Sequence, residues 1–393
     1  MAGPALGYWL AQYGFEVTIV EKASSVRAGG YPIDVRGTAV EVLERMGLVP
    51  QVRAAHLGTE RITLIGPDGR PVGQLQPEAV AGGVRGRDYE LPRGELASLL
   101  YDAVHSDVEL RFDDSIEWLR TDDRRVEVTF ASGRQQGFDL VIGADGLHSR
   151  TRQLAFGPEE RFTKHLGYAY AGFTVPNTLG LAHEAVMYNA PGRMAALYAP
   201  ARSDTLHGLL VTARTRPSSF ELSDVRSQRE MLGRRFADDG WQVPAMLEQL
   251  STADDLYFDV VTQIHLPSWS AGRVALVGDA AYAPSFFSGQ GTSIALAGAY
   301  VLAGELALHD DHSAAFAAYE RITRPYVSAN QAIAKGGGAT MAPTTAAMLR
   351  VRNLMLKAAP LLARTGLAGR SARRATTALD LPQYDGRAVW SGG

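Results

Sequence analysis

The stretch GRVALVGDAAYAPSFFSGQGTSIALAGAYVLAGEL, residues 272–306, decides how this chain folds. Its apolar run 274–277 does not alternate with polar residues, as expected for a strand buried on both faces of a parallel sheet. Gly278 and Asp279 form a turn at the carboxyl end of that strand, and Gly289-Gln290-Gly291 opens a long apolar helix. Ligands bind at such strand ends in α/β sheets, and a glycine-rich helix N-terminus can offer bare backbone N–H groups to an anionic or electron-rich group. The stretch therefore predicts an α/β fold with a ligand site between this strand and this helix.

The N-terminal stretch MAGPALGYWLAQYGFEVTIVEK, residues 1–22, has the order helix, glycine, strand, acid. Apolar residues at helical spacing follow Pro4, Gly14 ends the helix, and the β-branched run 15–20 predicts a strand. In a dinucleotide-binding βαβ unit, a G-x-G-x-x-G turn precedes the helix, and an acid about 20 residues further on accepts the ribose hydroxyls. Gly3 fits the third glycine and Glu21 fits the acid. The first strand and the first two glycines do not precede them, so the half-motif also fits an ordinary helix and strand.

A third informative stretch is DLVIGADGLHSRTR, residues 139–152. A short buried strand leads into the turn 143–146, where glycines allow close approach of a ligand and Asp145 can accept hydrogen bonds. Ser149, Arg150 and Arg152 then open a helix and can donate to phosphate. The same residues are equally typical of a plain strand-to-helix turn with an aspartate cap and solvated arginines.

Composition excludes several function classes. The 393 residues suggest two domains, and a net charge of −3 with 21% charged residues gives no basic excess for nucleic acid. Without cysteine there is no disulfide framework and no thiolate metal site, and the nine histidines show no metal-ligand spacing. No uninterrupted apolar run reaches the roughly 18 residues of a membrane span, and the N-terminus lacks a signal-peptide pattern. We expect a cytoplasmic protein with no nucleic-acid or membrane partner and no metal site.

The rest of the chain alternates βα units with strand-rich blocks. The segments 61–65 and 71–75 flank a Pro-Asp-Gly turn and predict a hairpin. Between about 165 and 215 strands alternate with turns, two helices are expected over about 224–250, and a strand is expected at 257–264. This block predicts a mostly antiparallel sheet beside the parallel one.

The three stretches, in this order, resemble the class A FAD-dependent aromatic hydroxylases, the p-hydroxybenzoate hydroxylase-like flavoprotein monooxygenases. The segments PIDVRG (32–37), GADG (143–146) and GDAAYAPSFFSGQGTS (278–293) are most similar to the branch of tetracycline-inactivating monooxygenases and aromatic polyketide hydroxylases. The resemblance covers essentially the whole chain, and the ordered set of motifs is far more specific than any one of them.

The resemblance implies an α/β fold with a Rossmann-like FAD-binding domain and an inserted, mostly antiparallel substrate domain. The FAD-binding domain would comprise 1–58, 88–153 and 266–335, the substrate domain 59–87 and 154–265, and a C-terminal helical segment 336–393. Gly336 to Gly338 would end the last FAD-domain helix. We expect the parallel sheet to lack its first strand, and we interpret Met1 as a residue inside a longer reading frame.

The resemblance also assigns roles residue by residue. Cofactor-binding positions are Gly3, Glu21, Lys22, Arg36, Arg93, Asp145, Asp279, Gly289, Gln290 and Gly291. Among these, Glu21 would bind the adenosine ribose, Arg36 and Arg93 would lie along the flavin and its chain, and Asp145 is associated with both FAD and NAD(P)H. The helix N-terminus at 289–291 would face the pyrimidine ring of the flavin.

The implied chemistry belongs to the cofactor rather than to catalytic side chains. In this family NADPH or NADH reduces FAD, oxygen adds to give a flavin C4a-hydroperoxide, and one oxygen atom is transferred to an electron-rich phenol or enol. The expected partner is thus a small aromatic molecule, and the protein is expected to be a monomer or weak homodimer. Candidate substrate-lining residues are Tyr170, Met187, Tyr188, Phe286 and Phe287, although aromatic residues on strands are also typical of an ordinary core.

The sequence departs from the family at two positions near the expected flavin site. Many relatives carry a histidine at Tyr282 and a proline at Phe286, so the substrate range does not carry over. Two other functions stay open. One is a non-oxygenating FAD oxidoreductase of the same fold, although a halogenase is disfavoured because W-x-W-x-I-P is absent. The other is a truncated, cofactor-free protein that acts as a binding module.

Overall fold

Two parallel strand pairs form the sheet core of the first lobe. The computed structural model describes residues 1–26, 31–77, 86–104, 106–199, 203–213, 224–363 and 374–384. Strand β1 (Thr18–Val20) pairs with β6 (Glu109–Arg111), and β10 (Val141–Gly143) pairs with β17 (Val274–Leu276), which also pairs antiparallel with β16 (Ser270–Ala271). The turns predicted to bind a ligand follow β10 and β17, so the pairing of these strands brings the turns side by side.

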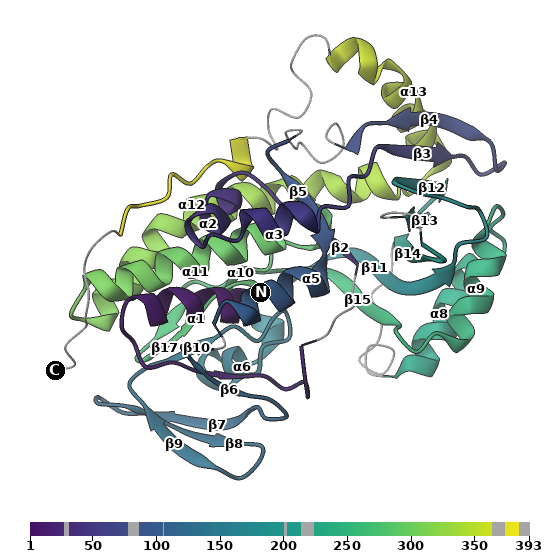
Figure 1. Ribbon diagram of the computed structural model, residues 1–393. Helices are drawn as coiled ribbons and strands as arrows, with labels where there is room; N and C mark the ends of the chain where they lie inside the picture. Colours follow the sequence, from purple (N-terminus) through teal and green to yellow (C-terminus); the bar gives the residue numbers. More distant parts are fainter. Residues whose placement is uncertain are drawn as a thin grey trace.

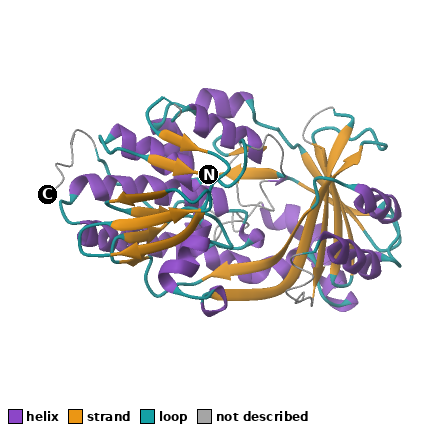
Figure 2. Ribbon diagram, turned by 90° about the horizontal axis from the view of Figure 1, so that it is seen from below, coloured by secondary structure: helices purple, strands orange, loops and turns teal. Residues whose placement is uncertain are grey.

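The second lobe is built on a seven-stranded sheet with the order β15-β11-β14-β13-β12-β3-β4 (Figures 1 and 2). Only β12 and β3 pair in parallel, so the predicted mostly antiparallel sheet is confirmed. Its strands are β3 (Arg61–Ile65), β4 (Pro71–Leu75), β11 (Thr163–Pro176), β12 (Glu184–Ala190), β13 (Arg193–Ala199), β14 (Thr205–Ala213) and β15 (Tyr257–Ile264). The predicted hairpin and the predicted strand 257–264 have the expected bounds.

Two smaller sheets are also present among the described residues. Strands β2 (Pro32–Val35) and β5 (Tyr89–Pro92) pair antiparallel, and β7 (Ile116–Thr121), β8 (Val126–Phe130) and β9 (Gln135–Phe138) form a three-stranded sheet. The short strand predicted before the turn 143–146 is β10, which pairs with β17, whereas the preceding strand β9 belongs to another sheet and pairs with β8.

Helix α11 (Gly291–Leu308) lies at the centre of the first lobe, and every residue from Ser293 to Leu306 is buried. It is apolar and long enough to cross a membrane, yet 78% of it is buried inside the fold, which marks it as a core helix. The other helices of this lobe are α1 (Ala2–Gln12), α2 (Thr38–Arg45), α3 (Val49–Ala54), α5 (Arg93–Asp102), α6 (Arg150–Phe156), η1 (Glu159–Arg161), α10 (Asp279–Tyr282), η2 (Phe286–Ser288) and α12 (His312–Met341). Figure 1 shows α1 and α12 beside α11, so the helix is covered on several sides.

Helix α1 packs closely on β1 because position 7 is a glycine. A Cβ atom on Gly7 would lie 2.7 Å from Cδ1 of Ile19, so a side chain at position 7 would force the Ile19 side chain to shift. Gly14 has a φ of 86° and turns the chain from the helix toward the strand, as the sequence predicts. The order helix, glycine, strand is therefore confirmed, although the strand is shorter than predicted.

The two faces of the seven-stranded sheet have different neighbours. Helices α8 (Val225–Phe236) and α9 (Val243–Thr252) cover the outer face, where Met231, Phe236 and Met246 join the sheet residues in one core cluster (Figure 1). The inner face carries a second cluster that includes Phe287 of η2 and Ala334 of α12. The inner face is therefore the one turned toward the first lobe.

The expectation that Gly336 to Gly338 end a helix is wrong, because α12 continues through all three glycines to Met341. A Cβ atom on Gly337 would lie 2.5 Å from Cβ of Phe287, and one on Gly338 would overlap the ring of Tyr168. Gly337 and Gly338 are therefore needed for the close packing of α12 on η2 and β11. The helix ends just before Pro343, which disfavours helical backbone at the residue preceding it.

The C-terminal segment contacts both lobes. Helix α13 (Ala346–Ala363) lies against β4 and β12 (Figure 1). Residues 379–384 return to the first lobe, where the Tyr384 hydroxyl donates to Glu305 at 2.7 Å and the Thr38 hydroxyl donates to the carbonyl of Leu379 at 2.8 Å. The remainder of the predicted segment 336–393, residues 364–373 and 385–393, lies outside the described residues.

Candidate cofactor site

The three sequence stretches meet at one place in the fold. A Cβ atom on Gly3 would lie 3.6 Å from Cβ of Ala144, and one on Gly278 would lie 2.9 Å from Cβ of Ala2. The N-terminal helix thus touches the turns after β10 and β17, although these segments are more than 130 residues apart in the sequence. The strand and helix termini predicted to bind a ligand therefore form one site.

Asp279 lies at the N-terminus of α10, in the turn that follows β17. Its side chain reaches solvent although protein surrounds it, and the resulting desolvation raises the pKa of its carboxyl, with the Arg93 guanidinium among the charges that oppose the rise. A Cβ atom on Gly291 would stand 3.7 Å from Oδ1 of Asp279. The carboxylate and the N-terminus of α11 therefore face the same space.

The other side of this space is formed by strand β2. Gly289 adopts the left-handed conformation with a φ of 61°, and a Cβ atom there would come within 3.6 Å of Oδ2 of Asp34. Asp34 forms an ion pair of 2.6 Å with Arg36, whose backbone N–H donates to Oγ of Ser293 at 3.1 Å. Burial raises the pKa of Asp34, and Arg36 opposes that shift. Arg36 thus joins β2 to the first turn of α11.

Gln290, the N-cap residue of α11, carries a buried acceptor without a partner. Its side chain is 1% exposed, and its Oε1 has no hydrogen-bond partner among the described residues. A buried amide oxygen without a partner costs about 1–3 kcal/mol, which a ligand with an N–H donor would recover. The pyrimidine ring of FAD has such a donor, and its hydroxylated, negatively charged chain suits the Arg36 and Arg93 guanidinium groups and the helix N-terminus. The residues present therefore fit FAD.

Glu21 ends β1, as the half-motif predicts, and lies beside α5. Its carboxylate accepts from the backbone N–H of Ala23 at 2.9 Å and from the Tyr101 hydroxyl at 3.5 Å. Burial raises the pKa of Tyr101 to about 12, and the charge of Glu21 adds to that shift. The neighbouring Lys22 is exposed. The ribose-binding roles of these two residues stay predictions.

Asp145 has a structural task in the turn after β10. Its carboxylate accepts from the Ser149 hydroxyl, from the Thr151 backbone N–H at 2.8 Å and from the Thr151 hydroxyl at 3.0 Å, and so holds the first turn of α6. Arg152 is fully buried and donates to the carbonyl of Ala280 at 2.9 Å. This arginine ties the turn to α10, so it is not one of the phosphate donors that the sequence suggested.

Four of the five candidate substrate residues lie together at the inner face of the seven-stranded sheet. Tyr170 and Phe287 belong to that cluster, and Met187 and Phe286 pack against it. The Tyr170 and Phe286 rings stack with centroids 4.4 Å apart. Tyr188 does not join them, because it lies in the cluster beneath α8 and α9 and its hydroxyl donates to Asp239 at 3.3 Å.

Two tyrosines that sequence reasoning missed border the same region. The Tyr257 ring lies 5.8 Å from Tyr170 and 6.2 Å from Tyr31, measured between centroids. The charges of Arg93, Asp279 and Asp259 all act on the Tyr31 hydroxyl, whose pKa is raised chiefly by burial. An aromatic row thus runs from the candidate cofactor site to Phe286. No motif or spacing marks these tyrosines in the sequence, because the row forms only when β11, β15 and η2 pack together.

Tyr282, which stands where many relatives carry a histidine, is a core residue. It is 1% exposed, and its hydroxyl accepts from the Tyr319 hydroxyl at 3.0 Å. Burial raises its pKa to about 12. A Cβ atom on Gly298 would overlap the Tyr282 hydroxyl, so the glycine in α11 is what admits the larger ring.

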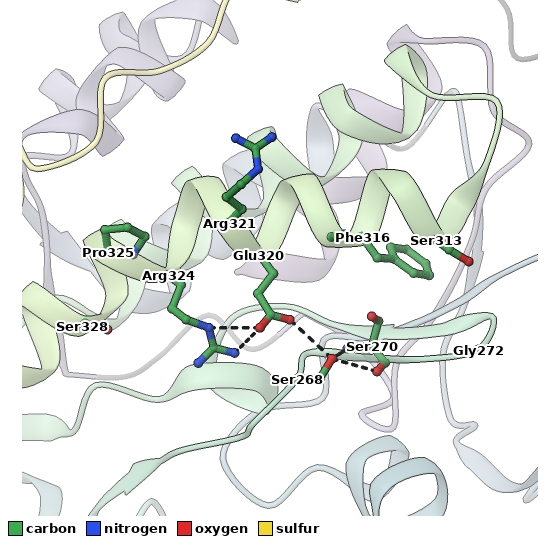
Figure 3. A pocket seen from close by; sticks show the side chains of 11 residues that line it. Ser268, Ser270, Gly272, Ser313, Phe316, Glu320, Arg321, Arg324, Pro325 and Ser328 are labelled. Atoms are coloured by element: carbon green, nitrogen blue, oxygen red, sulfur yellow. Dashed lines mark hydrogen bonds and ion pairs between the residues drawn. The ribbon is translucent and has the colours of Figure 1, made fainter.

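A surface pocket of about 780 Å³ lies elsewhere, between α12 and β16 (Figure 3). Its lining includes the ion pair between Glu320 and Arg324, while Arg321 points away from that pair. None of the predicted site residues lines it. Over the described part of the chain, no group of three or more His, Asp or Glu residues could hold a metal ion.

Comparisons with known proteins agree with this geometry. The family model described as "FAD binding domain" matches residues 1–332. The uncharacterized protein Rv1260 of Mycobacterium tuberculosis is 44% identical over 333 residues, covering 84% of this chain and 89% of the relative. A flavin-dependent monooxygenase from an unknown prokaryotic organism is 40% identical over 334 residues, covering 84% and 86%.

Solved structures extend the similarity to nearly the whole chain. The crystal structure of tetracycline destructase Tet(55) superposes with a TM-score of 0.84 at 35% identity, covering 98% of this chain and 96% of that one. Tetracycline destructase Tet(51) gives 0.82 at 32% identity with the same coverage. With the convergent glycine turns, Asp279 and the open Gln290 acceptor, these matches show that the chain belongs to the FAD-binding-domain family and is a flavin-dependent monooxygenase of the class A aromatic hydroxylase type.

Proposed function

We propose that this protein is an FAD- and NAD(P)H-dependent monooxygenase that hydroxylates an aromatic or polyketide-like phenol or enol. The observation that carries the proposal is the unpartnered Gln290 amide oxygen at the N-terminus of α11, next to the aromatic row that ends at Phe286. The resemblance to tetracycline destructases supports a polycyclic substrate. When bound, FAD would take electrons from NADPH or NADH and activate oxygen as a flavin C4a-hydroperoxide.

The chain's own residues would hold the reactants and exclude water. Gln290 would accept a hydrogen bond from the flavin ring, and the N-terminus of α11 would donate its free backbone N–H groups to that ring. Arg36 and Arg93 would bind the ribityl and phosphate chain, and Asp279 would accept hydrogen bonds from its hydroxyls. Phe286 and Tyr170 would stack on a planar substrate and keep the reacting atoms dry. No side chain is required as a catalytic acid or base, because the cofactor supplies the reactivity.

The function is tested in two steps. First, the purified protein is incubated with FAD and then desalted, and its visible absorption spectrum is recorded. We expect the flavin bands to be retained. Second, NADPH and NADH oxidation is followed with and without phenolic polyketides, and labelled oxygen is traced into the product. Flavin bands with oxidation but no oxygen incorporation would indicate a non-oxygenating oxidoreductase of the same fold. Absence of retained flavin would contradict the cofactor assignment.

We also propose that the enzyme works in the cytoplasm as a monomer or weak homodimer on a small aromatic molecule, without a nucleic-acid or membrane partner. The net charge of −3 and the burial of α11, the one helix among the described residues that is long and apolar enough to cross a membrane, support this setting. Sedimentation equilibrium of the FAD-loaded protein would measure the oligomeric state.

A further inference from the structure

Four side chains form a hydrogen-bonded chain from the surface to the aromatic row. His148 follows the turn after β10, and its ring nitrogens lie 2.9 Å from Oε1 of Glu159 and 3.4 Å from Oδ1 of Asp259. The Tyr257 hydroxyl donates to Oδ2 of Asp259 at 3.1 Å, and the Tyr170 hydroxyl lies 3.5 Å from that of Tyr257. This series of hydrogen bonds joins the two lobes. His148 belongs to the first lobe, and the other three residues lie on β15 and β11.

The strand register explains why these residues meet. Tyr170 lies directly opposite Asp259 in the antiparallel pair of β11 and β15. Because side chains alternate between the faces of a strand, Tyr257 and Asp259 point to the same face as Tyr170. That is the inner face of the sheet, where Tyr170 stacks on Phe286, three residues before Gly289. The chain thus ends beside the candidate cofactor site.

The direction of each hydrogen bond follows from the donors that are present. Both ring nitrogens of His148 face carboxylate oxygens, so both carry protons and the ring is cationic. Asp259 is therefore an acceptor only, and its Oδ1 also accepts from the backbone N–H of Val260 at 2.7 Å. Tyr257 must donate its one proton to Asp259, which leaves Tyr170 to donate its proton to Tyr257. Both hydroxyl protons are then donated within the protein, and neither tyrosine can donate to a ligand.

What remains at this edge is acceptor capacity alone. We call the two phenolic oxygens of Tyr170 and Tyr257 the acceptor edge. Tyr257 is 44% exposed, so its side chain borders space that solvent or a ligand can enter. From this geometry we infer that the acceptor edge selects a substrate that presents a hydrogen-bond donor, such as a protonated phenol, enol or amide N–H, and disfavours the corresponding ether or ketone. The inference rests on the proposed function for the place of the substrate.

Electrostatics support the fixed direction. The hydrogen bonds and charges of Asp259 and Glu159 raise the pKa of His148 to about 10, so the ring stays charged at neutral pH. Arg152 also donates to Glu159, at 2.7 Å, and keeps this carboxylate paired. Burial and the charge of Asp259 raise the pKa of Tyr257 well above its ordinary value, so the phenol keeps the proton that it donates.

The test compares two probes that differ in one group, a hydroxyl that can donate in the first and a methoxy group that cannot donate in the second. The FAD-loaded protein is titrated calorimetrically with 2-naphthol and with 2-methoxynaphthalene, its methyl ether. Because one hydrogen bond is at stake, we expect 2-naphthol to bind roughly five- to tenfold more tightly. Equal affinities, or no binding of 2-naphthol, would overturn the inference.

Two variants test the direction of the chain. In Asp259→Asn the amide keeps its oxygen for His148 and turns its N–H₂ toward Tyr257, so each hydrogen bond reverses and Tyr170 donates outward. The preference for 2-naphthol over its methyl ether should then disappear or reverse. In Tyr257→Phe the Tyr170 hydroxyl loses its acceptor and is free to donate, with the same expected loss. Tyr188→Phe, on the outer face of the sheet, is the matched control and should keep the preference.

An unchanged preference in both folded variants would contradict the inference. Calorimetry needs no flavin signal, so failure of the proposed function can be distinguished from failure of this inference. A chain that does not retain FAD would contradict the cofactor assignment, while the same titration of that chain would still decide whether the acceptor edge selects a donor.

Discussion

Gly291 and Asp279 face each other so closely that a Cβ atom on the glycine would stand 3.7 Å from the Oδ1 of the aspartate. The separation is ordinary van der Waals contact within the protein, so a small side chain at position 291 would leave the fold intact. It would, however, occupy the space between the carboxylate and the N-terminus of α11, which a cofactor chain needs.

We therefore expect Gly291→Val to lower the affinity for FAD by at least about tenfold, or roughly 1.4 kcal/mol, without loss of folded protein. The measurement is the flavin-to-protein ratio after desalting, with far-ultraviolet circular dichroism as the check on folding. Gly336→Ala is the control, because nothing lies within 4 Å of a Cβ atom there. Full flavin retention by Gly291→Val would contradict the placement of the cofactor.

Two of the three glycines in α12, Gly336 and Gly338, should respond in opposite ways to alanine. Gly336→Ala removes the flexibility cost of glycine in a helix and should stabilise the protein by up to about 1 kcal/mol. Gly338→Ala pushes a methyl group into the Tyr168 ring and should destabilise it by about 1–3 kcal/mol. Urea unfolding of both variants measures the difference. Equal effects would mean that α12 does not pack on β11 at this point.

His148 should stabilise the fold in a pH-dependent way. The pKa of its ring rises from 6.5 in the unfolded chain to about 10 in the folded one, through its hydrogen bonds to Asp259 and Glu159. Because the folded value is the higher one, the contribution is fully present below pH 6.5 and is lost as the pH rises through about 10. The ring is more than half exposed, so solvent screening limits the gain to about 1 kcal/mol.

The free energy of unfolding of the wild type should thus exceed that of His148→Gln below pH 6.5, and the two should converge near pH 10. Arg152, which donates to the same Glu159, stays charged over this range and does not change the sign. A difference that is constant with pH would show that the imidazole is not held as a cation.

Substitutions at the two faces of the seven-stranded sheet should have different effects, one on ligand binding and the other on stability. Phe286→Ala removes the ring that stacks on Tyr170 and should weaken 2-naphthol binding roughly tenfold. Met246→Ala, on α9 beneath the outer face, opens a cavity in a 2% exposed position and should cost about 2–5 kcal/mol of stability. Its affinity for 2-naphthol should be unchanged. Weaker binding in the α9 variant would mean that the ligand lies on the other face.

Elements with a clear local pattern could be predicted from the sequence, and the candidate cofactor-binding positions, which stay predictions, also stand at local features. The hairpin 61–65 and 71–75 and the strand 257–264 follow from patterns within a few residues, and the structure has them at the same bounds. Gly289, Gln290 and Gly291 were identifiable because a glycine-rich helix N-terminus is itself a local feature. The same holds for Gly3 and Asp279, which stand next to the strand or helix that positions them.

Close packing between distant segments could not be predicted in this way. Asp145 holds the first turn of α6, and α12 continues through Gly336 to Gly338, where Gly337 packs on Phe287 and Gly338 packs on Tyr168. Both outcomes depend on which neighbours fill the available volume, and local propensity does not contain that information.

Met187 and Tyr188 show most directly what the sequence predicts and what only the tertiary structure decides. Their alternation along β12 predicts that they point to opposite faces, but not which face turns toward the cofactor. The tertiary structure decided this, because Tyr188 lies in the core cluster beneath α8 and α9, whereas Met187 packs against the inner-face cluster that includes Phe287. The chain from His148 to Tyr170 was likewise decided by the register of β11 against β15, because a hydrogen bond between residues about 90 to 110 positions apart depends on how the strands pair.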